Sequence, residues 1–137
     1  IWVMSSGRPR AIDVATLPYP GIATDYLPMI VAVMSLAQGT SYATENVFAG
    51  RFRYVGELTR MGAQIRVEGH HLVVDGLPRL SGAPVQAVDI RAGAALVVAG
   101  LAADGETTIH HAGHIDRGYE HFVAKLTALG ADVERMD

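Results

Sequence analysis

Hydrophobic and polar positions along the chain switch repeatedly between helical and strand-like periods. An apolar segment, residues 29–37, ends near Gly39 and is followed by a short β-rich stretch at 41–45. A second segment with one apolar face, 51–61, also ends at a glycine and leads into the strand-like residues 64–68. Because glycine readily adopts the left-handed backbone that closes many helices, the pattern predicts helices and strands in alternation.

Further strands and one buried helix are expected after these elements. Residues 72–75 are predicted to pair with 64–68 through the turn at 69–71, and 85–88 to form one more strand. The helix that includes 96–101 is hydrophobic all round, so it is expected to be buried. The order of elements is βαβαββ, which predicts a mixed α/β (α+β) fold with helices packed on a sheet.

The sequence also contains an internal duplication. Residues 58–67 recur at 126–135, an offset of about 68 residues. Residues 36–40 have a counterpart that begins at Ala102, at a similar offset. Two repeated segments in the same order predict that the chain contains two copies of one structural unit.

The two copies are predicted to form one domain portion, with repeats at about 1–78 and 79–137. The boundary falls in residues 76–84, a segment with two prolines and two glycines. The second copy is expected to contain an amphipathic helix at 117–129 and a strand after Gly130.

Composition narrows the class of protein. Half of the 137 residues are hydrophobic and 18% are charged, which is typical of a folded globular chain. The formal net charge of -3 offers no broad basic surface for nucleic acid, so any bound phosphate must be held by a few placed arginines. The chain has no cysteine, which excludes both a disulfide framework and a thiolate zinc site.

No segment predicts membrane insertion or secretion. The longest apolar run, 29–37, is far too short to span a bilayer, and no charged region precedes Ile1 to suggest a signal peptide. A cytoplasmic setting is therefore expected. The chain starts inside a strand-like sequence without an initiator methionine, so a fragment of a longer protein is also expected.

Three predicted helix starts carry charged side chains: Asp25 at the first, Asp89 and Arg91 at the second, and Asp116 and Arg117 at the third. Unpaired N–H groups and the helix dipole favour anions at such positions, whereas an arginine there needs an anionic partner. Thr24 or Asp25 can cap the first helix, and Asp89 and Asp116 can cap the other two. The alternative role of Asp25 is a base for a hydroxyl group. The two arginines either form surface ion pairs or converge on one carboxylate or phosphate.

Other chemistries find little support. The histidines suggest a metal site, but adjacent residues on a strand point to opposite faces and no carboxylate-supported triad is evident, so no metal is expected. These histidines are His70, His71, His110, His111, His114 and His121. No Walker loop, dinucleotide-binding motif or GxSxG motif occurs. The residue pattern by itself indicates an anion-binding repeat protein.

Several strings resemble the sequences of UDP-N-acetylglucosamine 1-carboxyvinyltransferases. Residues 17–25 resemble the family's PYP...PTD segment, and 44–52 resemble its TE-VFE-RF loop. Residues 89–92 resemble its DLRA segment, and 114–120 are similar to its HIDRGYE signature near the C-terminus. The strings stand in the family's order and span essentially the whole chain, so the chain resembles the C-terminal part of these enzymes.

The resemblance implies a fold and a reaction. The family is built from six βαβαββ repeats in an inside-out α/β barrel arrangement around a cleft, of which this chain would supply two. The implied reaction transfers the enolpyruvyl group from phosphoenolpyruvate to the 3-hydroxyl of UDP-N-acetylglucosamine and releases phosphate. No metal or organic cofactor is implied, and neither nucleic acid nor membrane is an expected partner.

The resemblance also implies roles for individual residues. Asp25 would bind the sugar and deprotonate its 3-hydroxyl, while Arg91 and Arg117 would hold the anion derived from phosphoenolpyruvate. Three further residues would line the substrate: Val47 through its backbone, and Asp89 and Ile90 along the cleft.

The resemblance has one serious departure. The family's N-terminal Lys-Asn pair and its catalytic-loop Cys, which some members replace with Asp, have no counterpart here, so the chain alone is expected to be inactive without the missing N-terminal part. Two alternatives stay open. One is the related enzyme 5-enolpyruvylshikimate-3-phosphate synthase, and the other is a non-catalytic module that binds an anion.

Overall fold

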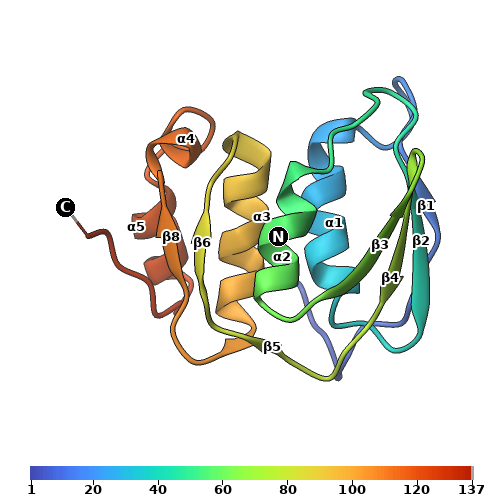
Figure 1. Ribbon diagram of the computed structural model, residues 1–137. Helices are drawn as coiled ribbons and strands as arrows, with labels where there is room; N and C mark the ends of the chain where they lie inside the picture. The colour runs from blue at the N-terminus through green and yellow to red at the C-terminus, as the bar shows by residue number, and fades with distance from the viewer. Residues whose placement is uncertain (137) are drawn as a thin grey trace.

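The computed structural model describes residues 1–136, and its largest sheet has four strands. Their spatial order is β1-β2-β4-β3, with β1 parallel to β2 and the other neighbours antiparallel (Figure 1). The strands are β1 (Val14–Ala15), β2 (Thr40–Thr44), β3 (Gln64–Glu68) and β4 (His71–Asp75). The central strand β4 buries three consecutive β-favouring or apolar side chains, Leu72, Val73 and Val74.

Three helices fill the middle of the molecule beside this sheet (Figure 1). They are α1 (Leu27–Met34), α2 (Arg53–Arg60) and α3 (Ile90–Leu101), and a single turn of 3-10 helix, η1 (Thr24–Tyr26), precedes α1. Helices α1 and α2 contact the sheet, and α3 packs against both of them. The small Ala and Gly side chains of α3 allow its backbone to pack close to α1. The helix that includes residues 96–101 is mostly buried, which confirms the prediction made from its hydrophobic sequence.

One continuous core joins the sheet to the three helices. Its largest fully buried side chains come from both halves of the chain: Leu27, Leu58, Met61, Leu72, Leu80 and Leu96. Each is at most 1% exposed, so the two halves share this core. The second half adds a smaller cluster of Ala87, Val97 and Ile115.

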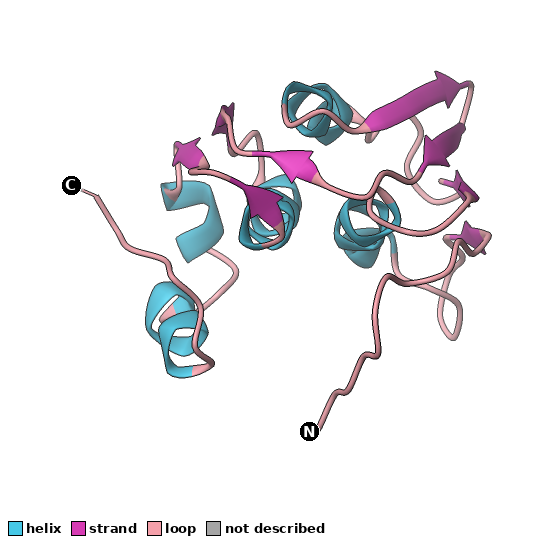
Figure 2. Cartoon of the chain, turned by 90° about the horizontal axis from the view of Figure 1, so that it is seen from below, coloured by secondary structure: helices cyan, strands magenta, loops and turns pink. Residues whose placement is uncertain are grey.

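The second half of the chain adds shorter elements around α3. Strands β5 and β7 form one parallel pair, and β6 and β8 form another. The elements are β5 (Leu80–Ser81), β6 (Pro84–Gln86), β7 (Ala103–Asp104), β8 (Thr108–His110), α4 (Gly113–Asp116) and α5 (Phe122–Ala128). Figure 2 shows helices flanked by strands on different sides and an N-terminal segment that extends away from them. Residues 1–136 do not close into a barrel.

The predicted βαβαββ order is confirmed for the first half, where the elements run β1-α1-β2-α2-β3-β4. The division into repeats near residue 78 stays a prediction. Two expectations for the second half were wrong. A helix does not run from 117 to 129, because α4 ends at Asp116 and α5 begins only at Phe122, after His121 in a left-handed conformation (φ 50°). Residues 131–136 form no strand, and no described strand pairs with them.

Two glycines allow the turn after α4 to approach the start of α3. A Cβ atom at Gly93 would lie 2.5 Å from Cγ1 of Ile115, and one at Gly118 would lie 2.5 Å from Cγ2 of Ile90. Any larger side chain would therefore separate α4 from the first turns of α3.

None of the helices within residues 1–136 combines the length and the apolar character that crossing a membrane requires.

Candidate active site

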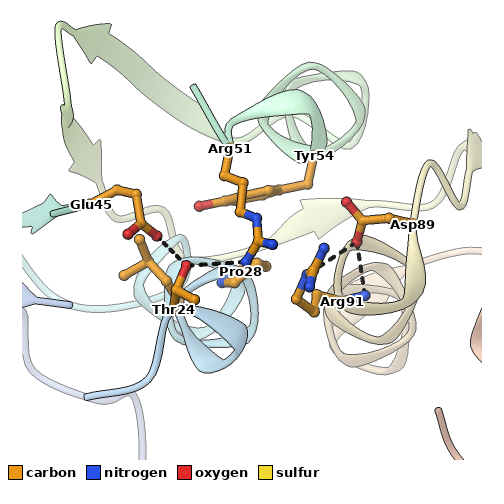
Figure 3. Close-up of a pocket in the computed structure, with 8 residues that line it drawn as sticks. Thr24, Pro28, Glu45, Arg51, Tyr54, Asp89 and Arg91 are labelled. Carbon is orange, nitrogen blue, oxygen red and sulfur yellow. Dashed lines mark hydrogen bonds and ion pairs between the residues drawn. The ribbon is translucent and has the colours of Figure 1, made fainter. Parts of the chain in front are cut away.

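The candidate site lies where several elements begin or end on one side of the molecule. Helices α1, α2 and α3 start beside the loop that follows β2, so their N-terminal ends gather there (Figures 1 and 3). Helix N-termini carry unpaired N–H groups and partial positive charge. The tertiary arrangement therefore concentrates groups that favour anions, and the arginines of the site add to this field.

Glu45 anchors the loop after β2. Its side chain is buried, and its Oε1 accepts hydrogen bonds from Thr16 Oγ1 at 2.6 Å and from the N–H groups of Val47 and Phe48 at 2.8 and 3.1 Å. Its Oε2 accepts a bond from Thr24 Oγ1 at 2.6 Å. Burial raises the pKa of Glu45, but these hydrogen bonds outweigh burial and hold the pKa below its ordinary value. Glu45 therefore stays ionised and ties η1 to the loop.

Asp25 lies in η1 with its side chain 61% exposed, between two arginines. Arg91 Nη1 lies 3.0 Å from Asp25 Oδ1, and Arg51 Nη1 lies 3.5 Å from the same oxygen. The expectation that Thr24 or Asp25 caps this helix was wrong, because neither η1 nor α1 has a side-chain cap. Thr24 instead donates to Glu45, which leaves the Asp25 carboxylate facing the arginines and solvent.

Arg91 belongs to the first turn of α3, where Asp89 is the N-cap. The Asp89 Oδ1 accepts hydrogen bonds from the N–H groups of Arg91 and Ala92, both at 2.9 Å, which confirms the predicted cap. The same oxygen lies 3.6 Å from Nε of Arg91. Arg91 therefore has anionic partners on two elements, Asp89 on its own helix and Asp25 on η1.

Arg51 also belongs to this cluster, although no pattern in the sequence assigned it a role. Its guanidinium lies 4.0 Å from the ring centroid of Phe48 and 3.5 Å from Thr24 Oγ1. The loop held by Glu45 places Phe48 against the Arg51 guanidinium. The two residues lie close together in an irregular segment, so no helical or strand period in the sequence indicates this contact. The sequence analysis missed Glu45 for a different reason, because its partners Thr16 and Thr24 lie 29 and 21 positions away, beyond the reach of a local pattern.

Arg117 lies apart from these ion pairs. It is the exposed C-terminal cap residue of α4, so the prediction that it opens a helix behind an Asp116 cap was wrong. Asp116 instead pairs with Arg135 at 2.8 Å. Within residues 1–136 the Arg117 side chain has no ion pair or hydrogen bond, and its convergence with Arg91 stays a prediction.

The segment that carries Arg117 nevertheless borders the site. Gly118 lies against Ile90, the first residue of α3. Burial and then the nearby Asp25 carboxylate raise the pKa of Tyr119, whose hydroxyl lies 3.9 Å from Sδ of Met29 on α1. Ile90 thus stands between the turn of Arg117 and the cap residue Asp89.

Val47 lies in the loop after β2 and is partly exposed. Because its N–H already donates to Glu45, only its carbonyl group and its side chain remain available for a ligand. Among residues 1–136, no three His, Asp or Glu side chains form a group that would hold a metal ion.

A small cavity lies among the side chains that Figure 3 labels. Its volume is ≈ 10 Å³, and its lining residues come from η1, α1, α2, α3 and the loops between them: Thr24, Leu27, Pro28, Glu45, Arg51, Tyr54, Asp89 and Arg91. Tyr54 is only 3% exposed, and its hydroxyl has no hydrogen-bond partner within residues 1–136. Burial, and then the Glu45 and Asp89 carboxylates, raise the pKa of Tyr54 far above its ordinary value.

Comparison with known proteins assigns this architecture to a family. The family model of EPSP synthase (3-phosphoshikimate 1-carboxyvinyltransferase) matches residues 2–126. The chain therefore belongs to that family, which is the class that its fold and sequence define.

Within the family, the similar proteins include UDP-N-acetylglucosamine 1-carboxyvinyltransferases. The one from Mycobacterium tuberculosis is 60% identical over 129 residues, which cover 94% of this chain and 31% of that protein. UDP-N-acetylglucosamine 1-carboxyvinyltransferase 3 of Symbiobacterium thermophilum is 61% identical over 132 residues, covering 96% of this chain and 31% of that protein.

A solved structure shows the same arrangement. The enolpyruvyl transferase NikO from Streptomyces tendae superposes with a TM-score of 0.84 at 33% sequence identity, over 94% of this chain and 30% of NikO. The chain thus spans about a third of the length of the relatives it matches.

Proposed function

We propose that this chain supplies part of the active site of an enzyme that transfers the enolpyruvyl group of phosphoenolpyruvate to the 3-hydroxyl of UDP-N-acetylglucosamine. The observation that carries the proposal is the Asp25 carboxylate, held by Arg91 at 3.0 Å beside converging helix N-termini. A base placed next to anion-binding groups is what addition of a hydroxyl group to an anionic enol ester requires. The 60–61% identity to UDP-N-acetylglucosamine 1-carboxyvinyltransferases supports this choice of sugar.

The chemistry divides into two steps. In the first, Asp25 takes the proton of the sugar 3-hydroxyl, the hydroxyl oxygen bonds to C2 of phosphoenolpyruvate, and C3 receives a proton from an acid outside this chain. In the second, a base outside this chain takes a proton from C3, and the bond between C2 and the phosphate oxygen breaks with its electron pair leaving on the phosphate. The double bond is restored and phosphate leaves, so no oxidant or reductant is needed.

The remaining proposed site residues act on charge and position. Arg91 and Arg117 bind the carboxylate and phosphate of the phosphoenolpyruvate-derived group, whose charge grows as the tetrahedral intermediate forms. The carbonyl of Val47 contacts the UDP-sugar, while Asp89 and Ile90 line the cleft at the start of α3. Because Asp25 and Arg91 form an ion pair, substrate binding must exchange part of that pairing for contacts to substrate.

The proposal covers only part of an active site. The Lys-Asn pair and the loop acid of the resembling family would come from the missing N-terminal part, so the 137-residue chain alone is proposed to be inactive. The enzyme would act in the cytoplasm, in the first committed step of peptidoglycan precursor synthesis. A non-catalytic anion-binding module is the alternative, and activity of the full-length protein separates the two.

Phosphate release tests the proposal. In the full-length protein, release is expected to require both UDP-N-acetylglucosamine and phosphoenolpyruvate, and Asp25→Asn is expected to lower kcat by about 10²- to 10⁴-fold with a smaller effect on the KM for UDP-sugar. Asp104→Asn is the matched control, because Asp104 forms a comparable exposed pair with Arg79 at 3.1 Å but lies outside the site. Unchanged turnover in Asp25→Asn would remove the proposed base, and release from phosphoenolpyruvate alone would contradict the transfer.

A further inference from the structure

The Tyr54 hydroxyl is a polar group of the site that none of the proposed steps uses and that no group within residues 1–136 hydrogen-bonds. Tyr54 lies in the first turn of α2, is 97% buried, and has no hydrogen-bond partner among residues 1–136. A buried hydroxyl without a partner is costly, and phenylalanine would fill the same apolar space without that cost. The presence of the hydroxyl therefore points to a partner that residues 1–136 do not themselves supply.

The small cavity beside Tyr54 has the properties of a hydrated site. Its volume of ≈ 10 Å³ is about that of one water-sized probe, which is the lower limit for holding a water molecule. Its lining combines two carboxylates, two hydroxyl groups and two guanidinium groups with the apolar Leu27 and Pro28. A cavity that offers several polar partners can hold a water molecule, whereas a purely apolar cavity stays dry.

The free hydrogen-bonding positions around the cavity suit one water molecule. The Glu45 Oε1 already accepts three hydrogen bonds, whereas Oε2 accepts only one, from Thr24 Oγ1. Figure 3 shows the phenol oxygen of Tyr54 directed toward the side of the cavity where Glu45 lies. A water molecule in between would accept the Tyr54 proton and donate to Oε2. The raised pKa of Tyr54 keeps the phenol protonated and able to donate.

We propose that Tyr54 is a positioning residue that holds one buried water molecule against Glu45, and that this water fixes the loop under Arg51 and hence the Arg51–Asp25 pair. The water belongs to the free protein and does not depend on substrate. Its effect on turnover rests on the proposed function, because Asp25 is the proposed base. The hydroxyl thus acts on the reaction through Glu45 and Arg51 without touching the substrate.

The first test is crystallographic and needs no activity. A high-resolution structure of the substrate-free full-length protein is expected to show an ordered water within hydrogen-bond distance of the Tyr54 hydroxyl and the Glu45 carboxylate. Tyr54→Phe is expected to lose this water or move it. A dry cavity in the wild-type protein, or a water at the same place in Tyr54→Phe, would overturn the proposal.

The second test is kinetic. Tyr54→Phe is expected to lower kcat about 3- to 10-fold with little change in either KM, because the loss of one hydrogen bond affects the placement of Asp25 and not the substrate contacts. The control is Tyr42→Phe, which removes an exposed phenol hydroxyl on β2 and is expected to leave kcat unchanged. Equal kcat values for wild type and Tyr54→Phe would refute the positioning role.

The remaining outcomes are also distinguishable. A rise in the KM for UDP-sugar alone, with a dry cavity in the free protein, would mean that a substrate oxygen occupies the space, which refutes the water. If the full-length protein shows no transfer at all, the proposed function fails, while the crystallographic comparison still decides whether Tyr54 holds the water. If Tyr54→Phe does not fold, the wild-type structure still shows whether a water molecule lies between the Tyr54 hydroxyl and the Glu45 carboxylate.

Discussion

The hydrogen bonds of Glu45 lead to a sharp prediction about the loop that carries Val47 and Phe48. Replacing Glu45 with Gln removes the charge but keeps one acceptor oxygen and nearly the same shape. The amide oxygen can take the place of Oε1 and accept the same three bonds, while the amide nitrogen takes the place of Oε2 and donates to Thr24 Oγ1. The variant therefore isolates the contribution of the negative charge.

The expected magnitude follows from the number of charge-assisted bonds. A hydrogen bond to a charged group contributes roughly 1.5–3 kcal/mol, compared with roughly 0.5–1.5 kcal/mol for a neutral one. Weakening the three bonds to Oε1, partly offset by the lower cost of burying a neutral amide, gives a loss of about 2 kcal/mol. Since a difference of 1.4 kcal/mol is tenfold in an equilibrium constant, local opening of the loop should become about 30-fold more frequent.

Amide hydrogen exchange measures this opening directly. In Glu45→Gln the N–H groups of Val47 and Phe48 are expected to exchange about 30-fold faster at neutral pH, while amides of β4 keep their protection. Glu68→Gln is the control, because Glu68 is exposed and has only a 3.8 Å contact with Arg66. Equal protection of Val47 and Phe48 in wild type and Glu45→Gln would show that the charge does not hold the loop.

The same carboxylate predicts a pH dependence. The pKa of Glu45 is lowered in the folded protein relative to its ordinary value of 4.5, so its stabilising contribution is fully present above pH 4.5 and is lost as pH falls through the lower folded pKa. Protection of Val47 and Phe48, corrected for intrinsic exchange, should therefore stay constant down to about pH 5 and fall below 4.5 in the wild type only. Loss of protection in Glu45→Gln over the same pH range would assign the titration to another group.

Two further predictions concern the turn after α4. Arg117→Ala is expected to raise the KM for phosphoenolpyruvate by about tenfold or more. It should have little effect on the free energy of unfolding, because the Arg117 side chain is exposed and has no partner within residues 1–136. An unchanged KM would remove Arg117 from the proposed site. Gly118→Ala is expected to destabilise the protein by about 1–3 kcal/mol, since its Cβ would lie 2.5 Å from Ile90 Cγ2, whereas Gly113→Ala meets no atom within 4 Å and should be nearly neutral. Equal melting temperatures for the two glycine variants would contradict the close contact with Ile90.

Local sequence was sufficient to predict the regular elements of the first half. The strands predicted at 64–68 and 72–75 follow from their β-favouring residues and from the turn between them, and the buried helix α3 follows from its hydrophobic sequence. The Asp89 cap was also predictable from local sequence, because a cap side chain bonds only to N–H groups two and three residues away. Short strands such as β7 were missed, since two residues cannot establish a period.

The site depended on contacts that no local pattern records. Asp25 meets Arg91 across 66 positions, and Glu45 meets Thr16 across 29. The same limitation explains the error at α4 and α5. The helical period continues through residues 117–129, but His121 adopts a left-handed conformation and Gly118 packs against Ile90, so tertiary packing overrides propensity.

The sequence by itself therefore determined the alternating α/β elements, the βαβαββ order of the first half, the capped start of α3, and the resemblance that names Asp25, Arg91 and Arg117. Only the tertiary structure decided that Asp25 faces two arginines instead of capping a helix, that Glu45 is the buried anchor of the neighbouring loop, and that the Tyr54 hydroxyl faces a water-sized cavity. The physical reason is that periodicity and caps act over a few residues, whereas ion pairs, burial and cavities depend on which distant segments the core brings together.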